Sequence, residues 1–348
     1  MKRTKKDTTL STQMKERIKT STPAEVNEYE GSDTLISTGS TLLDLAISGG
    51  RFRGGGIPCG ILVEIFGPSG AGKTVMLSEL AGAVRRKGGQ VLFHDPEARL
   101  NKVFARLFGL DLDDITYTIP NTIPEVFSQV RKWEPEGEGP HGIFADSLAA
   151  LSTELEMENE EGDKMGMRRA KEFSEQLRKT CRIITEKNYL MVCSNQIRQN
   201  LDAGPYGQKY ISPGGEAIGF YSSLRLRCMK PEKIKEKVKV AGKEVTRVIG
   251  VKTEVEVFKS SVWKPYRTAP LTILFDYGID DIRQNLQFIK DYTSSTVYTL
   301  EGQSLDKSMA KAIAIIEEEG LEEKLREEVI NLWEEIEAKF EQTRKSKI

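Results

Sequence analysis

The chain has 348 residues, of which 38% are hydrophobic and 30% are charged, and its formal net charge is −1. This length is typical of one large domain or of a core with appendages, and the near-neutral charge argues against a uniformly basic nucleic-acid binder. No apolar stretch approaches the roughly 20 residues of a membrane span. The basic N-terminus lacks the apolar core of a secretory signal, and the four cysteines contain no C-x-x-C pair. We therefore expect a cytoplasmic protein with no zinc site and no membrane partner.

The first elements in chain order are an arm, a helix and a strand. Residues 1–33 are polar and charged, and they form either a solvated tail or an arm that docks on a partner. ISTGSTLLDLAISGG then predicts an amphipathic helix with Ser40 or Thr41 as its N-cap and Gly49-Gly50 as its end. ILVEIFG, which follows a glycine-rich turn, predicts a buried parallel strand.

Strand and helix patterns alternate from there to Gln196. Helical spacing occurs in TVMLSELAGAVRRKGG, ARLNKVFARLFG, TIPEVFSQVRKW and MRRAKEFSEQLRKTCRIITEK; between them stand the short runs QVLFHD, DITYTIP, HGIFADS and YLMVCSNQI. This alternation predicts a mostly parallel sheet with helices on both faces. Asp95, Asp146 and Asn195-Gln196 each follow an apolar run. We expect them to converge, because ligands bind at the carboxyl ends of such strands.

The later part of the chain has a different pattern. SLRLRCM, VKVAGKEVTRVIGVKTEVEVFKS and APLTILFD are rich in β-formers, with turn signals at Ala241-Gly242 and Gly250, and they predict an antiparallel extension of the sheet. From Asp280 onward the pattern is helical. One expected helix face carries Leu321, Leu325, Val329, Trp333, Ile336 and Phe340. We expect three parts: an arm at 1–33, a core at 34–280 and a small, largely helical C-terminal domain at 281–348.

GPSGAGKT, at residues 67–74, fits the phosphate-loop pattern G-x-x-x-x-G-K-[ST]. It stands between a predicted strand and a predicted helix, where backbone N–H groups and the helix N-terminus can hold phosphates. Lys73 would reach the β- and γ-phosphates, and Thr74 would bind Mg²⁺. The residues expected to bind the nucleotide here are Gly67, Pro68, Ser69, Gly70, Ala71, Gly72, Lys73, Thr74 and Val75.

Three further side chains at the strand ends suit phosphate chemistry. Asp146 is a candidate magnesium holder, and the alternative is a helix N-cap. Glu97 can polarise an attacking water, and the alternative is an ordinary surface glutamate. Gln196 can sense the γ-phosphate and act as a switch element.

The order and spacing of these motifs resemble one family, the bacterial and phage RecA recombinases. The resemblance covers about Ile36 to Phe340. Its landmarks are ISTGSTLLD, VEIFGPSGAGKT, DPEARLN, ADSLAAL, SNQIR, PGGEAIGFYSSLRLR and the stretch from VFKSSVWKPY to DYGI. The resemblance implies an α/β fold: a RecA-like P-loop ATPase core whose mostly parallel sheet has an antiparallel extension. A small N-terminal arm and a small C-terminal α/β domain would flank this core.

The resemblance also implies roles for residues of the ATP site. Glu97 corresponds to the family's catalytic carboxylate, and Gln196 to the nucleotide-sensing glutamine that begins the second DNA-binding loop. Asn101 and Phe104 would contact the adenine. Lys259 matches the first of two lysines that reach the neighbouring subunit's ATP. Ser261 stands where the second lysine is expected, which is a departure from the family pattern.

Two loops would bind DNA in this family. In the first, Met165-Gly166 matches the family's Met-Gly, and a basic helix face would lie near the DNA backbone. The second loop follows Gln196 and contains an aromatic residue suited to base stacking. The expected DNA-binding residues are Met165, Gly166, Arg168, Arg169, Arg178, Arg198, Tyr206, Gly214 and Gly215. The alternatives are a solvated helix and an ordinary surface loop.

The sequence therefore predicts an enzyme, a DNA-dependent ATPase that uses ATP and Mg²⁺. It would form a helical filament on single-stranded DNA and exchange strands with homologous duplex DNA. One alternative is a regulatory or structural filament protein without strand exchange, and another is a hexameric translocase of the same superfamily. The chain ends in basic TRKSKI, and the basic stretch 225–252 predicts a hairpin that either is solvated or lies on the nucleic-acid or inter-subunit side.

Overall fold

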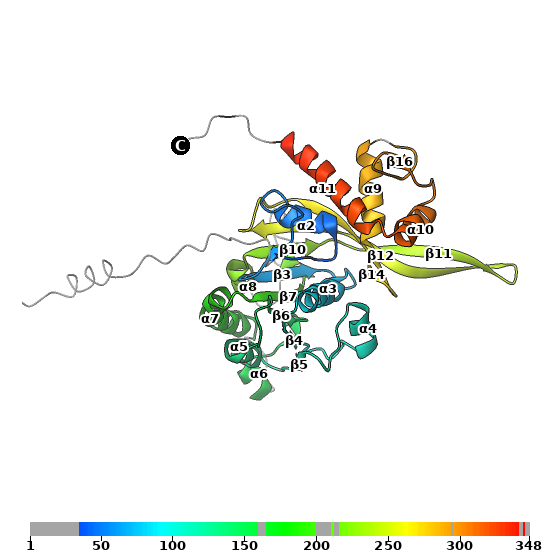
Figure 1. Cartoon of the computed structure of the whole chain (residues 1–348). Helices are drawn as coiled ribbons and strands as arrows, with labels where there is room; N and C mark the ends of the chain where they lie inside the picture. Colours follow the sequence, from blue (N-terminus) through cyan, green and yellow to red (C-terminus); the bar gives the residue numbers. More distant parts are fainter. Residues whose placement is uncertain are drawn as a thin grey trace, which may run out of the picture. The chain divides into compact units, whose positions relative to one another are not determined.

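A central mixed sheet organises the computed structural model, which describes residues 35–158, 165–199, 210–211, 216–293, 295–340 and 344. The strands of this sheet are β3 (Leu62–Gly67), β4 (Val91–His94), β5 (Thr116–Thr118), β6 (Gly142–Ala145), β7 (Leu190–Gln196), β10 (Leu224–Cys228), β11 (Glu232–Val240), β12 (Lys243–Ser260), β13 (Thr268–Leu274) and β14 (Gly278–Ile279). Their order is β14-β13-β12-β10-β3-β7-β6-β4-β5, and β11 pairs with β12 (Figure 1).

The sheet has a parallel half and an antiparallel half. All pairs from β10 through β3, β7, β6 and β4 to β5 are parallel. The pairs that involve β11, β12, β13 and β14 are antiparallel. The predicted α/β class, a mostly parallel sheet with an antiparallel extension, is confirmed.

Helices cover both faces of the sheet. They are α2 (Thr41–Ser48), α3 (Lys73–Arg86), α4 (Lys102–Leu107), α5 (Ile123–Lys132), α6 (Glu154–Glu158), α7 (Met165–Glu186), α8 (Glu216–Tyr221), α9 (Asp281–Thr293), α10 (Met309–Glu319) and α11 (Glu322–Ala338). Short two-residue strands occur at β1 (Leu35–Ile36), β2 (Ile57–Pro58), β8 (Arg198–Gln199), β9 (Tyr210–Ile211), β15 (Thr299–Leu300) and β16 (Gln303–Ser304), and a 3₁₀ turn spans Leu148–Ala150.

Alternation along the strands creates two apolar clusters. In β3, Val63 and Ile65 join a cluster that includes residues of α2, α3, α9 and α11, whereas Leu62 joins a second cluster with α5, α7 and α8. Successive side chains of a strand point to opposite faces, so a strand buried on both faces is apolar throughout. This explains why β6, most of β3 and the first residues of β7 are apolar.

Side-chain caps fix the starts of α2 and α5, and the cap of α2 is one that the sequence predicts. The Ser40 side chain accepts a hydrogen bond from the Leu43 N–H at the start of α2. At the start of α5, Thr122 and Glu125 form a reciprocal capping box. Such caps satisfy backbone N–H groups that have no partner within the helix.

Gly250 does not form a turn, contrary to the sequence-based expectation. Strand β12 continues through it, and the pairing with β11 shifts register beside it, between Ile234 and Lys235. A Cβ atom at position 250 would lie 2.3 Å from the Ile273 carbonyl oxygen of β13. Gly250 is therefore required for close approach of two strands, while the predicted turn at Ala241-Gly242 does join β11 to β12.

The C-terminal helices pack on the same apolar cluster as α2 and β13. Leu325, Val329 and Trp333 of α11 are buried in it. The first residue of the expected face, Leu321, is the N-cap of α11, because Gly320 adopts a left-handed conformation (φ 63°) and ends α10 just before it. The expected face fails at its C-terminal end, because Phe340 follows α11 and is 71% exposed. The division at residue 281 into core and C-terminal domain remains a prediction, and the arm at 1–33 lies outside the described residues.

Candidate active site

The phosphate loop connects β3 to α3 at the carboxyl edge of the parallel half. Its last residues begin α3 at Lys73, and its glycines curl the backbone: φ is 74° at Gly70 and 86° at Gly72. Residues with a Cβ atom rarely adopt this left-handed region. A Cβ at Gly72 would also lie 2.1 Å from the Ile273 Cδ1 atom. The loop geometry therefore depends on glycine at this position for two reasons.

Lys73 is held across the loop from which it arises. Its Nζ atom donates to the Gly67 carbonyl at 3.1 Å and to the Pro68 carbonyl at 2.8 Å, and the residue is only 9% exposed. Burial lowers the pKa of Lys73, and the nearby acidic groups Asp146 and Glu97 counteract part of that effect. An ammonium group that is short of water interacts strongly with phosphate oxygens.

Asp146 connects three elements of the site. The Thr74 hydroxyl donates to its Oδ2 atom at 2.6 Å, and the Ser194 hydroxyl of β7 donates to Oδ1. The N-cap of the following 3₁₀ turn is Ser147, so Asp146 does not take the alternative role of a cap. Thr74 and Asp146 form an oxygen pair that fits Mg²⁺, which typically takes one or two protein oxygens and completes its shell with phosphates and water. Within the described ranges no group of three or more acidic, histidine or cysteine residues could hold a metal by itself.

Glu97 lies in the turn after β4, within reach of the residue that follows Asp146. Its Oε1 atom accepts a hydrogen bond of 3.4 Å from the Ser147 hydroxyl, and Arg99 forms an ion pair with Oε2 at 2.6 Å. The Glu97 side chain is 17% exposed. Asp95 has a different role, because its buried carboxylate accepts from the Leu100 N–H and the Tyr117 hydroxyl and so fixes this turn.

Gln196 lies beside the start of the phosphate loop. It is paired with Gly67 in the register of β3 and β7, and its side chain is exposed. Its backbone N–H donates to the Asn195 side chain, whose amide donates at 3.0 Å to Glu64. The strand ends therefore converge as expected: Lys73, Thr74, Asp146, Glu97 and Gln196 stand along one edge.

Comparison with known proteins shows the family to which the chain is similar. The family model described as the RecA N-terminal domain matches residues 16–280. The protein RecA of Wolbachia pipientis is 34% identical over 257 residues, which is 74% of this chain and 68% of that protein. The protein RecA of Thermus thermophilus is 34% identical over 248 residues, or 71% of this chain and 69% of that protein. That of Methylococcus capsulatus is 36% identical over 246 residues, or 70% and 66%.

The chain belongs to the RecA family. The family match ends at residue 280, where α9 is about to begin.

The position that resembles the RecA inter-subunit lysine lies away from the chain's own phosphate loop. Lys259 donates to the Gly219 and Phe220 carbonyls, each at 2.9 Å, near the end of α8. Burial lowers its pKa, and the positive charge of Arg225, its cross-strand partner, contributes. The Ser261 hydroxyl donates to the Ser223 carbonyl at 3.2 Å.

Glu64 is a buried acid that was not predicted from the sequence, and it lies between the side chains of Arg225 and Asn195. Glu64 of β3 is fully buried and accepts from Arg225 at 2.6 Å and from Asn195. The Arg225 guanidinium also lies 4.6 Å from the centre of the Phe66 ring. Ser147 and Ser194 were missed as well. The charged residue inside VEIFG is the one signal that could have revealed Glu64.

The residues expected at the adenine are on α4. Asn101 is the N-cap, and its side chain accepts from the Phe104 N–H at 2.8 Å. The Phe104 ring is half-buried and packs edge-on against Phe108, with ring centres 4.9 Å apart. The predicted adenine contact stays a prediction.

The residues expected to bind DNA are only partly described. Arg168 and Arg178 are exposed on α7, whereas Arg169 is half-buried and donates at 3.0 Å to the Ala149 carbonyl, three residues after Asp146. The side chains of Met165 and Arg198 and residue Gly166 lie outside the described side chains, although their backbones belong to α7 and β8. Tyr206, Gly214 and Gly215 lie outside the described residues.

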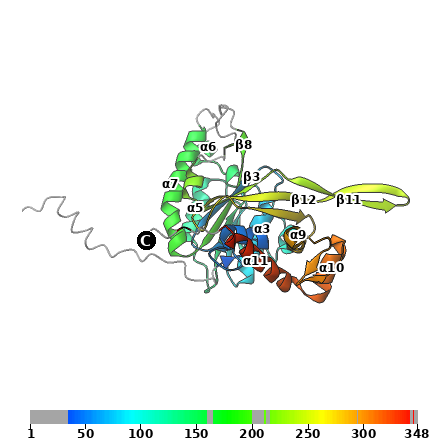
Figure 2. The ribbon, with the colours of Figure 1, turned by 90° about the horizontal axis from the view of Figure 1, so that it is seen from above.

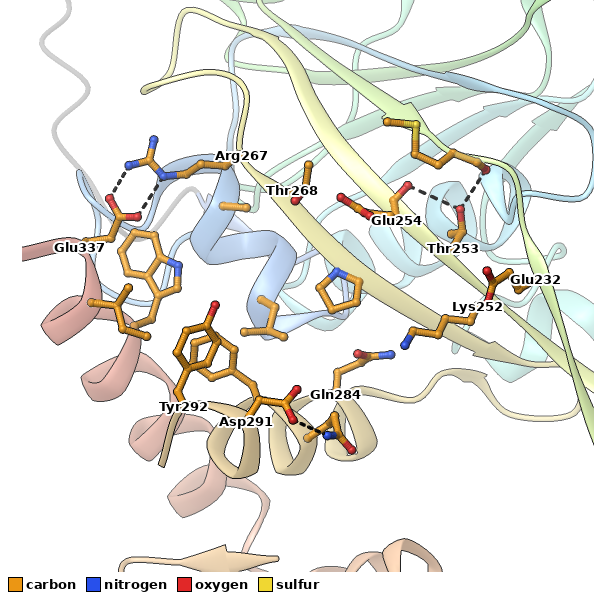
Figure 3. Close-up of a pocket in the computed structure, with 18 of the residues that line it drawn as sticks. Glu232, Lys252, Thr253, Glu254, Arg267, Thr268, Gln284, Asp291, Tyr292 and Glu337 are labelled. Atoms are coloured by element: carbon orange, nitrogen blue, oxygen red, sulfur yellow. Dashed lines mark hydrogen bonds and ion pairs between the residues drawn. The ribbon is translucent and has the colours of Figure 1, made fainter. Parts of the chain in front are cut away.

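A separate cavity lies between the antiparallel strands and the C-terminal helices (Figure 3). Its volume is about 690 Å³. Phe288, Tyr292 and Trp333 contribute apolar surface, and an ion pair between Arg267 and Glu337 lies at one side. The cavity shares no lining residue with the phosphate loop, Glu97 or Asp146, so it is separate from the candidate nucleotide site.

No helix among the described residues is long and apolar enough to cross a membrane.

Proposed function

We propose that this protein is an ATP-dependent recombinase that forms filaments on single-stranded DNA and catalyses homologous pairing and strand exchange. One observation carries the proposal. The ATPase residues Lys73, Thr74, Asp146 and Glu97 stand at the strand edge that Gln196 shares, and Gln196 begins the segment that resembles the RecA DNA-binding loop. Gln196 is paired with the first residue of the phosphate loop and directly precedes the proposed DNA-binding loop. A structural change at the phosphates would therefore reach that loop through a single residue.

The ATPase half follows from side chains at the strand ends. Lys73 would neutralise charge on the β- and γ-phosphates. Thr74 and Asp146 would hold Mg²⁺, which supplies positive charge to the phosphate oxygens when bound. Glu97 would orient the attacking water and accept its proton. Ser147, the residue after Asp146, donates a hydrogen bond to Glu97. This contact would hold the Glu97 carboxylate in a fixed position relative to Thr74 and Asp146.

The DNA half uses two segments that flank this edge. We assign Arg168 and Arg178 to the DNA backbone because both are exposed on α7. Arg169 would instead position the start of α7, because it is bound to the carbonyl that follows the Asp146 segment. Met165, Gly166, Arg198, Tyr206, Gly214 and Gly215 retain their proposed roles at the two DNA loops.

The inter-subunit part of the proposal rests on Lys259. It would reach the ATP of a neighbouring subunit, and the arm at 1–33 would dock on that subunit. The hydroxyl of Ser261 provides no positive charge at the second lysine position. We expect weaker coupling between neighbouring ATP sites than a pair of lysines would give, and a lower Hill coefficient for ATP hydrolysis than in a Ser261→Lys variant.

Strand exchange between circular single-stranded DNA and homologous linear duplex tests the function. The account predicts ATP-dependent joint molecules, and none with Lys73→Ala, which loses nucleotide binding. ATP-dependent filaments on DNA without joint molecules would instead identify a regulatory or structural filament. Closed hexamers in electron micrographs would identify a translocase.

A further inference from the structure

Ser194 is a fully buried hydroxyl residue in the interior of the sheet. It belongs to β7, and the two residues that point to the same face of this strand, Leu190 and Val192, are fully buried members of an apolar cluster. Packing alone would favour an apolar side chain at position 194 as well, because burying a hydroxyl costs free energy unless it forms a hydrogen bond. The partner of this hydroxyl therefore indicates what the serine does.

The partner is Asp146, whose carboxylate is held by two hydroxyl groups from different elements. Ser194 donates to the Oδ1 atom, and Thr74 of α3 donates to the Oδ2 atom at 2.6 Å. The backbone of Asp146 is fixed separately, because its N–H donates to the His94 carbonyl at 2.9 Å. With the backbone and both oxygens held, the carboxylate has one favoured orientation.

Hydroxyl donors orient this carboxylate without neutralising its charge. Other acids near the same edge have basic partners: Arg225 lies 2.6 Å from Glu64, and Arg99 lies 2.6 Å from Glu97. Among the described residues, Asp146 forms no ion pair with a basic side chain. Its negative charge therefore remains available to attract a cation, with which a bound guanidinium group would compete.

The hydroxyl also ties the carboxylate to a strand and not to a loop. Strand β7 lies between β3 and β6 in the sheet (Figure 1), and Gln196, two residues after Ser194, is paired with Gly67 of the phosphate loop. The chain then continues into β8, which Figure 2 shows at the same end of the molecule as α6. Strands hold the residues of a site more precisely than loops do, so β7 is a rigid support for Asp146.

We propose that Ser194 is a positioning residue for the metal site, and that its hydroxyl holds the Asp146 carboxylate in the orientation that binds Mg²⁺. This inference rests on the proposed function, in which Thr74 and Asp146 hold this ion. Side chains that hydrogen-bond a metal-binding residue commonly contribute about 10- to 100-fold to metal affinity. Without the hydroxyl the carboxylate could turn, whereas Lys73 and the phosphate-loop backbone would still bind the nucleotide.

Binding of a fluorescent, non-hydrolysable ATP analogue tests this assignment independently of catalysis. The full-length wild type, Ser194→Ala and Ser194→Cys are titrated with the analogue at a series of Mg²⁺ concentrations and in EDTA. Cysteine has roughly the volume of serine but is a weak donor, so the second variant removes the hydrogen bond without opening a cavity. Ser48→Ala is the matched control, because Ser48 is also fully buried and donates at 2.7 Å to the Gly56 carbonyl, outside the site.

The Ser194→Ala variant is expected to need about 10- to 100-fold more Mg²⁺ than the wild type for half-maximal binding of the analogue. Its affinity in EDTA should equal that of the wild type, because the phosphate loop is unchanged. Ser194→Cys should shift the Mg²⁺ requirement in the same direction, and it decides the question if Ser194→Ala does not fold. Ser48→Ala should have the wild-type requirement.

Three results would overturn the role of Ser194. Its folded variants could keep the wild-type Mg²⁺ requirement, Ser48→Ala could shift that requirement as much, or the Ser194 variants could lose as much affinity in EDTA as in Mg²⁺, which would indicate a distorted phosphate loop.

An Asp146→Asn variant separates this inference from the proposed function. If it binds the analogue with the wild-type dependence on Mg²⁺, the proposed metal site and the role of Ser194 both fail. If Asp146→Asn alone raises the Mg²⁺ requirement, the proposed metal site stands and the role of Ser194 fails.

Discussion

The two halves of the sheet use their residues differently. In the parallel half, the candidate site residues lie at strand ends, where Asp146 follows β6 and Gln196 ends β7, and both meet the phosphate loop. In the antiparallel half, β11 and β12 extend outward and present side chains along their length. The first arrangement gathers side chains from distant segments at one place, and the second leaves an extended exposed surface.

The difference follows from topology. Parallel strands place all their carboxyl ends on one edge, so short polar sequences far apart in the chain converge there. An antiparallel hairpin needs no crossover connection, so it can leave the body of the domain and expose both faces. We therefore expect substitutions in the parallel half to alter chemistry and stability, and those on the hairpin to alter association.

The largest effect is expected for Glu97→Gln in the parallel half. Loss of the carboxylate should lower the rate of ATP hydrolysis about 10²- to 10⁴-fold, because water activation is lost. Nucleotide affinity should survive and an ATP-bound filament should accumulate, as followed by steady-state hydrolysis and by titration with a fluorescent nucleotide. Arg99→Gln is the matched control, because Arg99 is exposed and forms an ion pair with Oε2 of Glu97, the carboxylate oxygen that does not contact Ser147. Hydrolysis at the wild-type rate by Glu97→Gln would refute this assignment.

The next largest effect is expected at the junction of the two halves. Glu64→Gln leaves the Arg225 guanidinium without its buried counter-charge, and the free energy of unfolding should fall by about 3 to 5 kcal/mol. Urea denaturation measures this change. A Glu64→Leu, Arg225→Met double variant should recover much of the loss, because no uncompensated charge remains. Wild-type stability of Glu64→Gln would show that the buried ion pair does not stabilise the fold.

A pH-dependent effect is expected from His94 in the parallel half. Burial lowers the pKa of His94 from 6.5 to about 4. The unfolded chain therefore binds a proton that the folded chain does not, and stability should decline as pH falls from 6.5 to about 4. The contribution is at most about 3 kcal/mol. A His94→Asn variant, less stable at neutral pH, should lack this component; identical pH profiles for both proteins would contradict it.

A smaller effect is expected for Gly250→Ala at the base of the hairpin. The added methyl group would press on the Ile273 carbonyl, and the free energy of unfolding should fall by about 1 to 3 kcal/mol. Gly242→Ala tests the hairpin tip, where φ is 82° but a Cβ would meet no neighbour. Thermal unfolding of both variants separates crowding from backbone strain. An effect confined to Gly242→Ala would contradict the close-approach explanation.

Sequence reasoning reached the parts of the site that local patterns specify. GPSGAGKT is recognisable because its glycines and lysine have fixed spacing, and Asp146 because it ends an apolar run. The mixed sheet could be predicted because the alternating strand and helix patterns give way to a β-rich stretch after Leu224. These features depend on residues that are neighbours in the chain.

The remaining features depend on contacts between distant segments. Glu64 and Asn195 are 131 positions apart, and only the register of β3 and β7 joins them. Ser194 and Ser147 have no local signature, because their partners come from other strands. Gly250 was misread for the same reason, since a glycine needed for a neighbouring strand looks like a turn in sequence.

ATP hydrolysis by the wild-type protein, measured with and without single-stranded DNA, tests the central claim most directly. The account joins the phosphate loop to a DNA-binding segment through Gln196, so single-stranded DNA should raise the hydrolysis rate several-fold or more. Lys73→Ala should show no hydrolysis in either condition. A wild-type rate that single-stranded DNA leaves unchanged would contradict the coupling on which the proposed function depends.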